Sequence, residues 1–142
     1  MTVLPFKFAD ILMAFEHANG GRPGENAALL RKDLGQIFYS ANFSRISDIT
    51  DRDRAASDAV ELPRKRDLGL DQKLAFDFVR EFLPPRYIDK AAAIFSEPLA
   101  YRKFKGWLKG KAMHTKWFAY EREATERALR AWCAEHEVEL EA

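Results

Sequence analysis

The chain has 142 residues, 47% apolar and 13% aromatic, which excludes an intrinsically disordered protein. Because 23 lysines and arginines nearly balance 22 aspartates and glutamates, a uniformly basic nucleic-acid-binding protein is also excluded, although a local basic patch is not. The length predicts a single domain covering residues 1–142. A single cysteine, Cys133, allows no internal disulfide and favours a reduced, cytoplasmic setting. The N-terminal apolar run is too short and too charged for a signal peptide or a membrane span, so we expect no membrane association.

The N-terminal half predicts one helix and a small antiparallel sheet. Apolar residues at helical spacing from Phe8 to Phe15 predict an amphipathic helix that ends at Asn19-Gly20-Gly21. Two short runs, Ala27 to Arg31 and Gln36 to Ala41, enclose a four-residue loop with a glycine and predict a β-hairpin. Residues 59–62 predict a third strand, which Pro63 would stop.

Residues 42–58 are polar and charged, without a helical or an alternating period, and predict a mobile loop. Its aspartates Asp48, Asp51 and Asp53 are spaced like part of a calcium-binding loop. The glycine and the closing glutamate of such a loop are missing from their places, so we expect a solvated segment instead.

The C-terminal half predicts helices only. A strongly apolar helix from Leu74 to Leu83, capped by Asp67 or Asp71, would end at Pro84-Pro85. A short helix follows from Tyr87 to Phe95. Ser96 is the predicted N-cap of the helix after that.

Two further helices fill the stretch from Leu99 to Cys133. The first has an apolar stripe, formed by Tyr101, Phe104 and Leu108, and a break at Gly110. The second has its own stripe, formed by Trp117, Tyr120, Ala124, Ala128 and Trp132. We expect the two stripes to meet, and all three tryptophans to report on one core. The chain therefore predicts an α+β fold, with a small antiparallel sheet packed with about five helices.

Several blocks of this chain resemble the UPF zero-one-five-eight group, an uncharacterised bacterial protein family. They are Ala100-Tyr101-Arg102-Lys103-Phe104-Lys105, Trp117-Phe118-Ala119-Tyr120 and Arg130-Ala131-Trp132. The order of helix, hairpin and Phe-rich helix is also similar, from Phe8 to Val138. The family often has Asn-Gly where this chain has His136-Glu137. The resemblance implies a bacterial source and an α+β fold, and it carries over no activity and no functional residue.

A basic stretch is the main functional feature. From Leu99 to Lys116 the chain has no acidic residue, and aromatic residues alternate with cations. Arg102, Lys105 and Lys109 share one helical face, and Lys103 and Lys116 lie near it in sequence. This face could bind an acidic protein surface or a phosphate backbone, or it could merely be solvated, perhaps paired with the acidic C-terminal end. We expect a non-catalytic interaction or regulatory module with a protein partner, with nucleic acid as the alternative.

Glu121 falls within the apolar stripe that contains Trp117, where an unpaired buried carboxylate would be costly. We expect a hydrogen bond or ion pair that fixes how the helices dock, with Tyr101, Lys105, His17 and Arg31 as candidate partners. The alternative is a carboxylate that lines a pocket and has a raised pKa.

The sequence has no nucleophile elbow and no phosphate-binding loop, so an enzyme without a recognisable motif is the third hypothesis. The four candidate metal ligands are His17, His114, Cys133 and His136. Only the last two share a helical spacing, and a structural zinc needs about four such ligands. We therefore expect no metal and no cofactor, and the sequence does not specify an oligomeric state.

Overall fold

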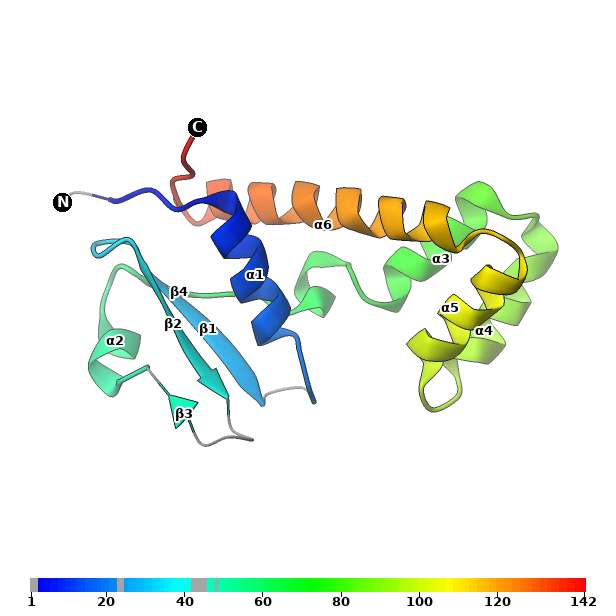
Figure 1. The fold of residues 1–142 in the computed structure, drawn as a ribbon, viewed down its shortest axis with the longest axis horizontal. Coiled ribbons are helices and arrows are strands. Elements are labelled where there is room, and N and C mark those ends of the chain that lie inside the picture. Colours follow the sequence, from blue (N-terminus) through cyan, green and yellow to red (C-terminus); the bar gives the residue numbers. More distant parts are fainter. Residues whose placement is uncertain (1–2, 23–24, 42–45, 48) are drawn as a thin grey trace. The chain divides into compact units, whose positions relative to one another are not determined.

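The computed structural model describes residues 3–22, 25–41, 46–47 and 49–142. Over these residues the predicted α+β class is confirmed, because a small sheet lies in the N-terminal half and the C-terminal half is helical (Figure 1). The chain forms two compact units. The sheet unit comprises Met1–Asp67 and Ala128–Ala142, and the helical unit comprises Leu68–Arg127. That the whole chain is a single domain stays a prediction.

In the described part of the chain, no helix is both long enough and apolar enough to cross a lipid bilayer.

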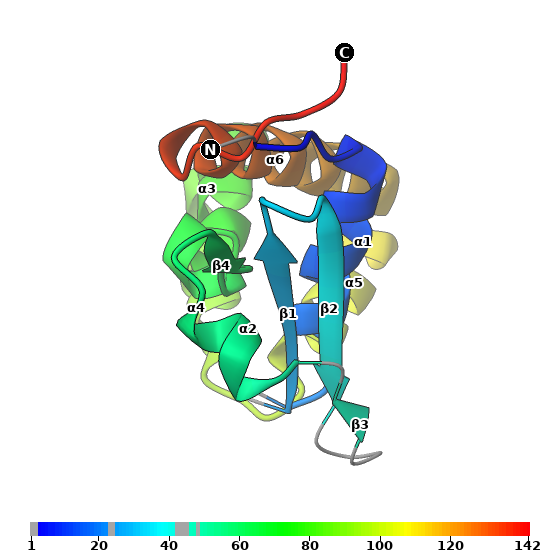
Figure 2. The same cartoon turned by 90° about the vertical axis from the view of Figure 1, so that its left-hand side faces the viewer.

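The sheet is built around the predicted hairpin. β1 (Asn26–Arg31) and β2 (Gln36–Ala41) are antiparallel, and β4 (Ala59–Glu61) pairs with β1 as the predicted third strand. The two-residue β3 (Ile46–Ser47) pairs with β2, so the strand order is β3-β2-β1-β4 (Figure 2). Gly35 closes the hairpin turn at a φ of 62°, a conformation that glycine adopts without strain.

Helix α1 (Phe8–Ala18) packs against β1 and confirms the predicted first helix. Asn19 ends α1, and its side chain donates a hydrogen bond to the carbonyl of Pro63 at 3.1 Å and accepts one from the amide of Lys65 at 2.8 Å. The guanidinium of Arg64 donates to the carbonyl of the last α1 residue at 2.6 Å. The segment after β4 is thus fixed to the C-terminal end of α1.

The predicted loop over residues 42–58 is wrong at residues 46–47, which form β3, and at residues 51–55, which form helix α2 (Asp51–Ala55). Thr50 caps this helix, because its hydroxyl oxygen accepts from the amide of Asp53 at 3.1 Å while the carboxylate of Asp53 accepts from the amide of Thr50 at 3.1 Å. Such a reciprocal capping box stabilises a helix too short to show a hydrophobic period. Residues 42–45 and Asp48 lie outside the described residues, and the mobility of the segment stays a prediction.

The helical unit follows a short 3-10 turn, η1 (Lys65–Leu68). Its elements are α3 (Gln72–Phe82), the 3-10 turn η2 (Pro85–Tyr87), α4 (Ile88–Phe95), α5 (Ala100–Gly110) and the first part of α6 (His114–Glu135). Of the two predicted caps for α3, the structure selects Asp71, whose carboxylate accepts from the amide of Lys73 at 3.3 Å.

The predicted N-cap of α5 is wrong. The hydroxyl of Ser96 donates to the carbonyl of Ala93 at 2.7 Å, and Ser96 therefore ends α4 instead of starting α5. An N-cap must directly precede the first helical residue, and that position is held by Leu99. Leu99 has a φ of 57°, in the left-handed region that residues with a side chain seldom occupy.

The predicted meeting of the two apolar stripes is confirmed in the helical unit. The rings of Phe104 on α5 and Trp117 on α6 have centroids 5.2 Å apart, and Phe78 on α3 lies 5.3 Å from Trp117. The expectation of one core for all three tryptophans is wrong, because Trp132 belongs to the sheet unit. At 1.5 Å per residue, Trp117 and Trp132 lie about 22 Å apart along α6, too far to share one small core.

Candidate interaction surface

Helix α5 carries the predicted cationic face. Arg102, Lys105 and Lys109 are exposed, and we call these three residues the α5 basic face. Phe104 and Leu108, which lie on the other side of the same helix, are fully buried. Within the described ranges none of the three cations forms an ion pair. The face is therefore positively charged and available to a ligand.

The other two predicted members, Lys103 and Lys116, do not belong to the α5 basic face: Lys103 points to another side of α5, and Lys116 lies on α6. The ammonium of Lys103 lies 2.9 Å from the carboxylate of Glu97, and this hydrogen bond lowers the pKa of Glu97. The ammonium of Lys116 lies 4.4 Å from the centre of the Phe82 ring, a cation–π contact. The structure thus places three of the five predicted cations on one face of α5.

An apolar hollow adjoins the α5 basic face. This open depression of about 540 Å³ is lined by Leu99, Ala100, Tyr101, Arg102 and Lys105, and we call it the Leu99 depression. The side chain of Leu99 is 68% exposed. No pattern in the sequence singles out Leu99, because residue spacing predicts neither its left-handed backbone conformation nor the exposure of its side chain. The depression places apolar surface directly beside two cations.

The spacing predicted Glu121 to lie within the buried stripe, but in the structure its side chain is only partly buried. In the part of the chain that the structure describes, no hydrogen bond or ion pair to its carboxylate is formed. Burial, and secondarily the charge of Glu121, raise the pKa of Tyr101, whose hydroxyl donates to the carbonyl of Leu70 at 3.4 Å. Two predicted partners have other contacts: His17 Nε2 lies 2.9 Å from the carbonyl of Ser40, and Arg31 binds two aspartates. A pocket role for Glu121 stays a prediction.

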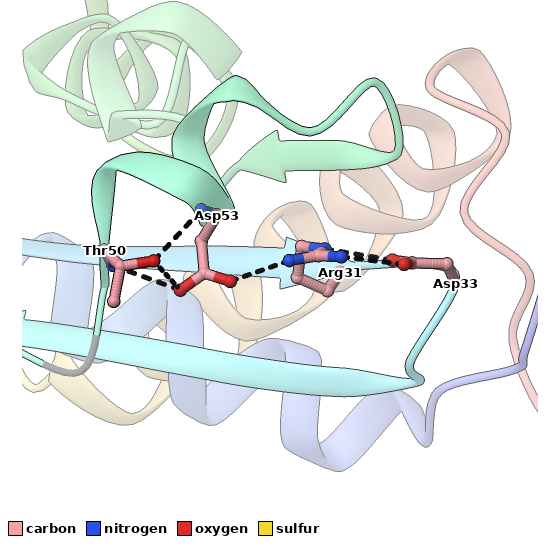
Figure 3. Close-up of polar contacts among 4 residues, drawn as sticks. All are labelled: Arg31, Asp33, Thr50 and Asp53. Atoms are coloured by element: carbon pink, nitrogen blue, oxygen red, sulfur yellow. Dashed lines mark hydrogen bonds and ion pairs between the residues drawn. The ribbon is translucent and has the colours of Figure 1, made fainter.

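Arg31 is the centre of a charged network in the sheet unit (Figure 3). Its guanidinium donates two hydrogen bonds to Asp33, at 3.0 and 2.7 Å, and a third to Asp53 at 2.7 Å. The pKa of Asp33 is lowered chiefly by the bond from Arg31, and that of Asp53 by the bonds from Thr50 and then by Arg31.

Each carboxylate of this network is already occupied by donors from its neighbours. We interpret the network as a structural link that holds α2 to the end of β1. The T-x-x-D spacing of Thr50 and Asp53 is the pattern in the sequence from which the capping box could have been predicted.

A second hollow, in the sheet unit, bears on the enzyme hypothesis. It has a volume of about 330 Å³, and the side chains that line it include Asp10, Tyr39 and Glu141. Burial and the charge of Asp10 raise the pKa of Tyr39. Both carboxylates are exposed to solvent, whereas an acid catalyst that works near neutral pH needs burial or a close like charge. This hollow gives no support to a catalytic pair.

The candidate metal ligands are not assembled into a site. Cys133 is buried, which raises the pKa of its thiol to about 11, and the His136 ring packs against Trp132 in a tilted arrangement, with the ring centroids 4.7 Å apart. Across the described residues, no group of three or more His, Cys, Asp or Glu side chains is placed to hold a metal ion.

No protein-family model, curated protein or solved structure matches this chain. Its resemblance to the UPF zero-one-five-eight group therefore stays a prediction, and the candidate function depends on the geometry of the surface itself.

Proposed function

We propose that this chain is a non-catalytic interaction module of a bacterial cytoplasm, and that its helical unit binds an acidic segment of another protein. The observation that carries the proposal is the Leu99 depression, an apolar hollow with Arg102 and Lys105 at its wall. A partner segment that fits both features combines carboxylates with at least one apolar side chain.

Each part of the surface contributes differently to such binding. Covering an exposed leucine side chain is favourable by about 1.5–3 kcal/mol, and this burial would supply affinity. Exposed cations add little affinity each, but they speed association with an acidic partner and disfavour basic ones. Together, the apolar hollow and the cations would bind such a segment specifically and with moderate affinity, as expected of a regulatory contact.

The charge distribution of the chain supports an acidic partner. The helical unit has twelve lysines and arginines and eight aspartates and glutamates, a net charge of +4. The sheet unit has eleven and fourteen, a net charge of −3. The net charge of the whole chain is therefore close to zero although the helical unit is basic, and the α5 basic face lies in this basic unit.

Nucleic acid is the alternative ligand, and the Leu99 depression argues against it. Contacts to a phosphate backbone are made by cations and hydrogen-bond donors. A duplex keeps its bases stacked inside and presents charged phosphates, so it places no apolar base in the hollow. An acidic peptide with an apolar side chain uses the cations and the hollow together.

The test compares two fluorescent peptides of equal negative charge by anisotropy. One peptide places leucines among its glutamates, and the other has serine in place of each leucine. We expect the leucine peptide to bind about tenfold more tightly, which corresponds to the burial of one leucine. A duplex oligonucleotide, titrated over a range of salt concentrations, tests the alternative.

Two triple variants assign the binding to the surface. Arg102→Gln/Lys105→Gln/Lys109→Gln removes the α5 basic face, and we expect it to weaken binding of the leucine peptide about tenfold. A matched control removes the same charge from exposed positions elsewhere in the helical unit, at Lys90, Arg122 and Arg127. Equal weakening by both triples, or tighter binding of the oligonucleotide than of either peptide, would contradict the proposal.

A further inference from the structure

A second group of cations lies on the other side of α5, around the aromatic ring of Tyr87. The ammonium of Lys111 lies 3.8 Å from the centre of that ring, and the guanidinium carbon of Arg86 lies 4.8 Å from it. The ring of Trp107 has its centroid 5.9 Å from that of Tyr87. We call these four residues the Tyr87 cluster. By helical spacing, Trp107 and Lys111 lie roughly opposite the α5 basic face, so the two surfaces are distinct.

The Tyr87 cluster has several hydrogen-bond donors and no carboxylate to accept from them. Arg86 donates to the hydroxyl oxygen of Tyr87 at 3.2 Å, which uses one of its five N–H groups. Among the described residues, neither Arg86 nor Lys111 forms an ion pair with a carboxylate, and the Tyr87 hydroxyl donates to no acceptor. The hydrogen bond from Arg86, together with nearby Lys111, lowers the pKa of Tyr87. The positive charge at this cluster is therefore uncompensated.

The type of anion follows from these donors. A guanidinium, an ammonium and a phenol hydroxyl offer three separate donor groups and two positive charges. A terminal phosphoryl group offers three acceptor oxygens and close to two negative charges near neutral pH. A carboxylate has two oxygens and one charge, and a phosphodiester has two free oxygens and one charge. By its number of acceptor oxygens and its charge, the terminal phosphoryl group matches this set of donors better than the other two anions do.

We propose that the Tyr87 cluster binds a terminal phosphoryl group, either of inorganic phosphate or of a phosphate monoester. The site is independent of the peptide-binding surface proposed above, because it uses none of the α5 basic face residues. Each proposal can therefore fail without the other.

The indole N–H of Trp107 provides a reporter beside the site. Its NMR signal, assigned with Trp107→Phe, is followed while phosphate or glycerol phosphate is added to the whole chain at constant ionic strength. Sodium chloride and a single-stranded oligonucleotide serve as comparison titrations. We expect a saturable shift with phosphate. A similar or tighter response to glycerol phosphate would identify an ester as the ligand, and a response to inorganic phosphate alone would identify the free anion.

Variants then locate the response. Lys111→Gln removes a charged donor and is expected to weaken phosphate binding about tenfold, and Tyr87→Phe, which keeps the ring, is expected to weaken it several-fold. Lys109→Gln is the matched control on the opposite side of α5 and is expected to leave the affinity unchanged. Arg86→Gln replaces Lys111→Gln if circular dichroism shows that the latter has lost its fold.

Three results would overturn the proposal. The first is a shift that does not exceed the one sodium chloride produces. The second is a saturable shift that is the same in Lys111→Gln and Lys109→Gln, which would place the anion elsewhere. The third is tighter binding of the oligonucleotide than of either phosphate compound, which would show that a phosphodiester is preferred.

Discussion

Trp117 is expected to be the most costly single side chain to truncate in the helical unit. It is fully buried, and three aromatic rings, those of Phe78, Phe104 and Tyr120, lie within 6.3 Å of its own. A buried tryptophan covers about 150–250 Å², which at about 25 cal/mol per Å² amounts to roughly 4–6 kcal/mol. Because alanine keeps its β carbon and the neighbouring rings relax, we expect Trp117→Ala to lower the free energy of unfolding by about 4 kcal/mol.

Trp117→Phe is the informative companion. The indole Nε1–H of Trp117 is buried and has no hydrogen-bond partner among the described residues. Phenylalanine removes this unsatisfied donor, which offsets part of the lost packing. We expect this variant to cost about 1–2 kcal/mol, well below the alanine variant.

Urea unfolding followed by far-UV circular dichroism measures both losses. Phe118→Ala, at a neighbouring position that is 48% exposed, is the control and should cost less than about 1 kcal/mol. A loss below about 1 kcal/mol for Trp117→Ala would show that the aromatic contacts among α3, α5 and α6 do not hold the helical unit together.

Two further predictions concern Leu99 and the Arg31 network. Because Leu99 has left-handed backbone geometry, Leu99→Gly should raise the free energy of unfolding by about 1 kcal/mol, measured by urea unfolding, and should weaken binding of the leucine peptide. The lowered pKa values of Asp33 and Asp53 stabilise the fold above about pH 3.9, the ordinary pKa of an unfolded aspartate, and this stabilisation is lost as the pH falls through their folded values. Asp53→Asn should therefore unfold more easily than the unaltered chain at neutral pH but lose less stability in acid, as urea midpoints at several pH values would show. If Leu99→Gly left the free energy of unfolding and the peptide affinity unchanged, the strain and the binding role assigned to Leu99 would be wrong. If the urea midpoints of Asp53→Asn and the unaltered chain fell in parallel as the pH is lowered, the stabilising role assigned to the Asp53 carboxylate would be wrong.

Periodicity predicted the parts of this fold that depend on local pattern. The helix from Phe8, the hairpin around Gly35 and the cationic face of α5 follow directly from residue spacing, and the structure has each of them. These features depend on interactions within a few residues of the chain, which a hydrophobic period reflects.

The failures occurred where a single hydrogen bond or the length of an element decided the outcome. Helix α2 has no apolar period and depends on the box between Thr50 and Asp53. Ser96 could cap either neighbouring helix, but its hydroxyl donates to the carbonyl of Ala93, and Ser96 therefore ends α4. The stripe of α6 continues from Trp117 to Trp132, but spacing does not show that the helix passes from one compact unit into the other.

The Tyr87 cluster could not have been predicted from spacing. Lys111 lies in the basic stretch, but Arg86 and Tyr87 come from a 3-10 turn before α4, and only the folded chain brings them together. Residue spacing likewise predicts neither the left-handed backbone nor the exposed side chain of Leu99. The candidate site was therefore predictable as a charged face, but the apolar hollow beside it was not.

We propose that α5 binds an acidic protein segment, and photo-crosslinking from position 99 would identify the molecule that lies against this helix. A photoreactive residue replaces Leu99 in the full chain, which is expressed in its own host, irradiated and examined by mass spectrometry. We expect a covalent adduct with a protein at an acidic stretch that contains apolar residues. This adduct should disappear in the Arg102→Gln/Lys105→Gln/Lys109→Gln background but persist in the matched control triple. An adduct with nucleic acid, an adduct that survives loss of the α5 basic face, or no adduct at all would contradict this proposal.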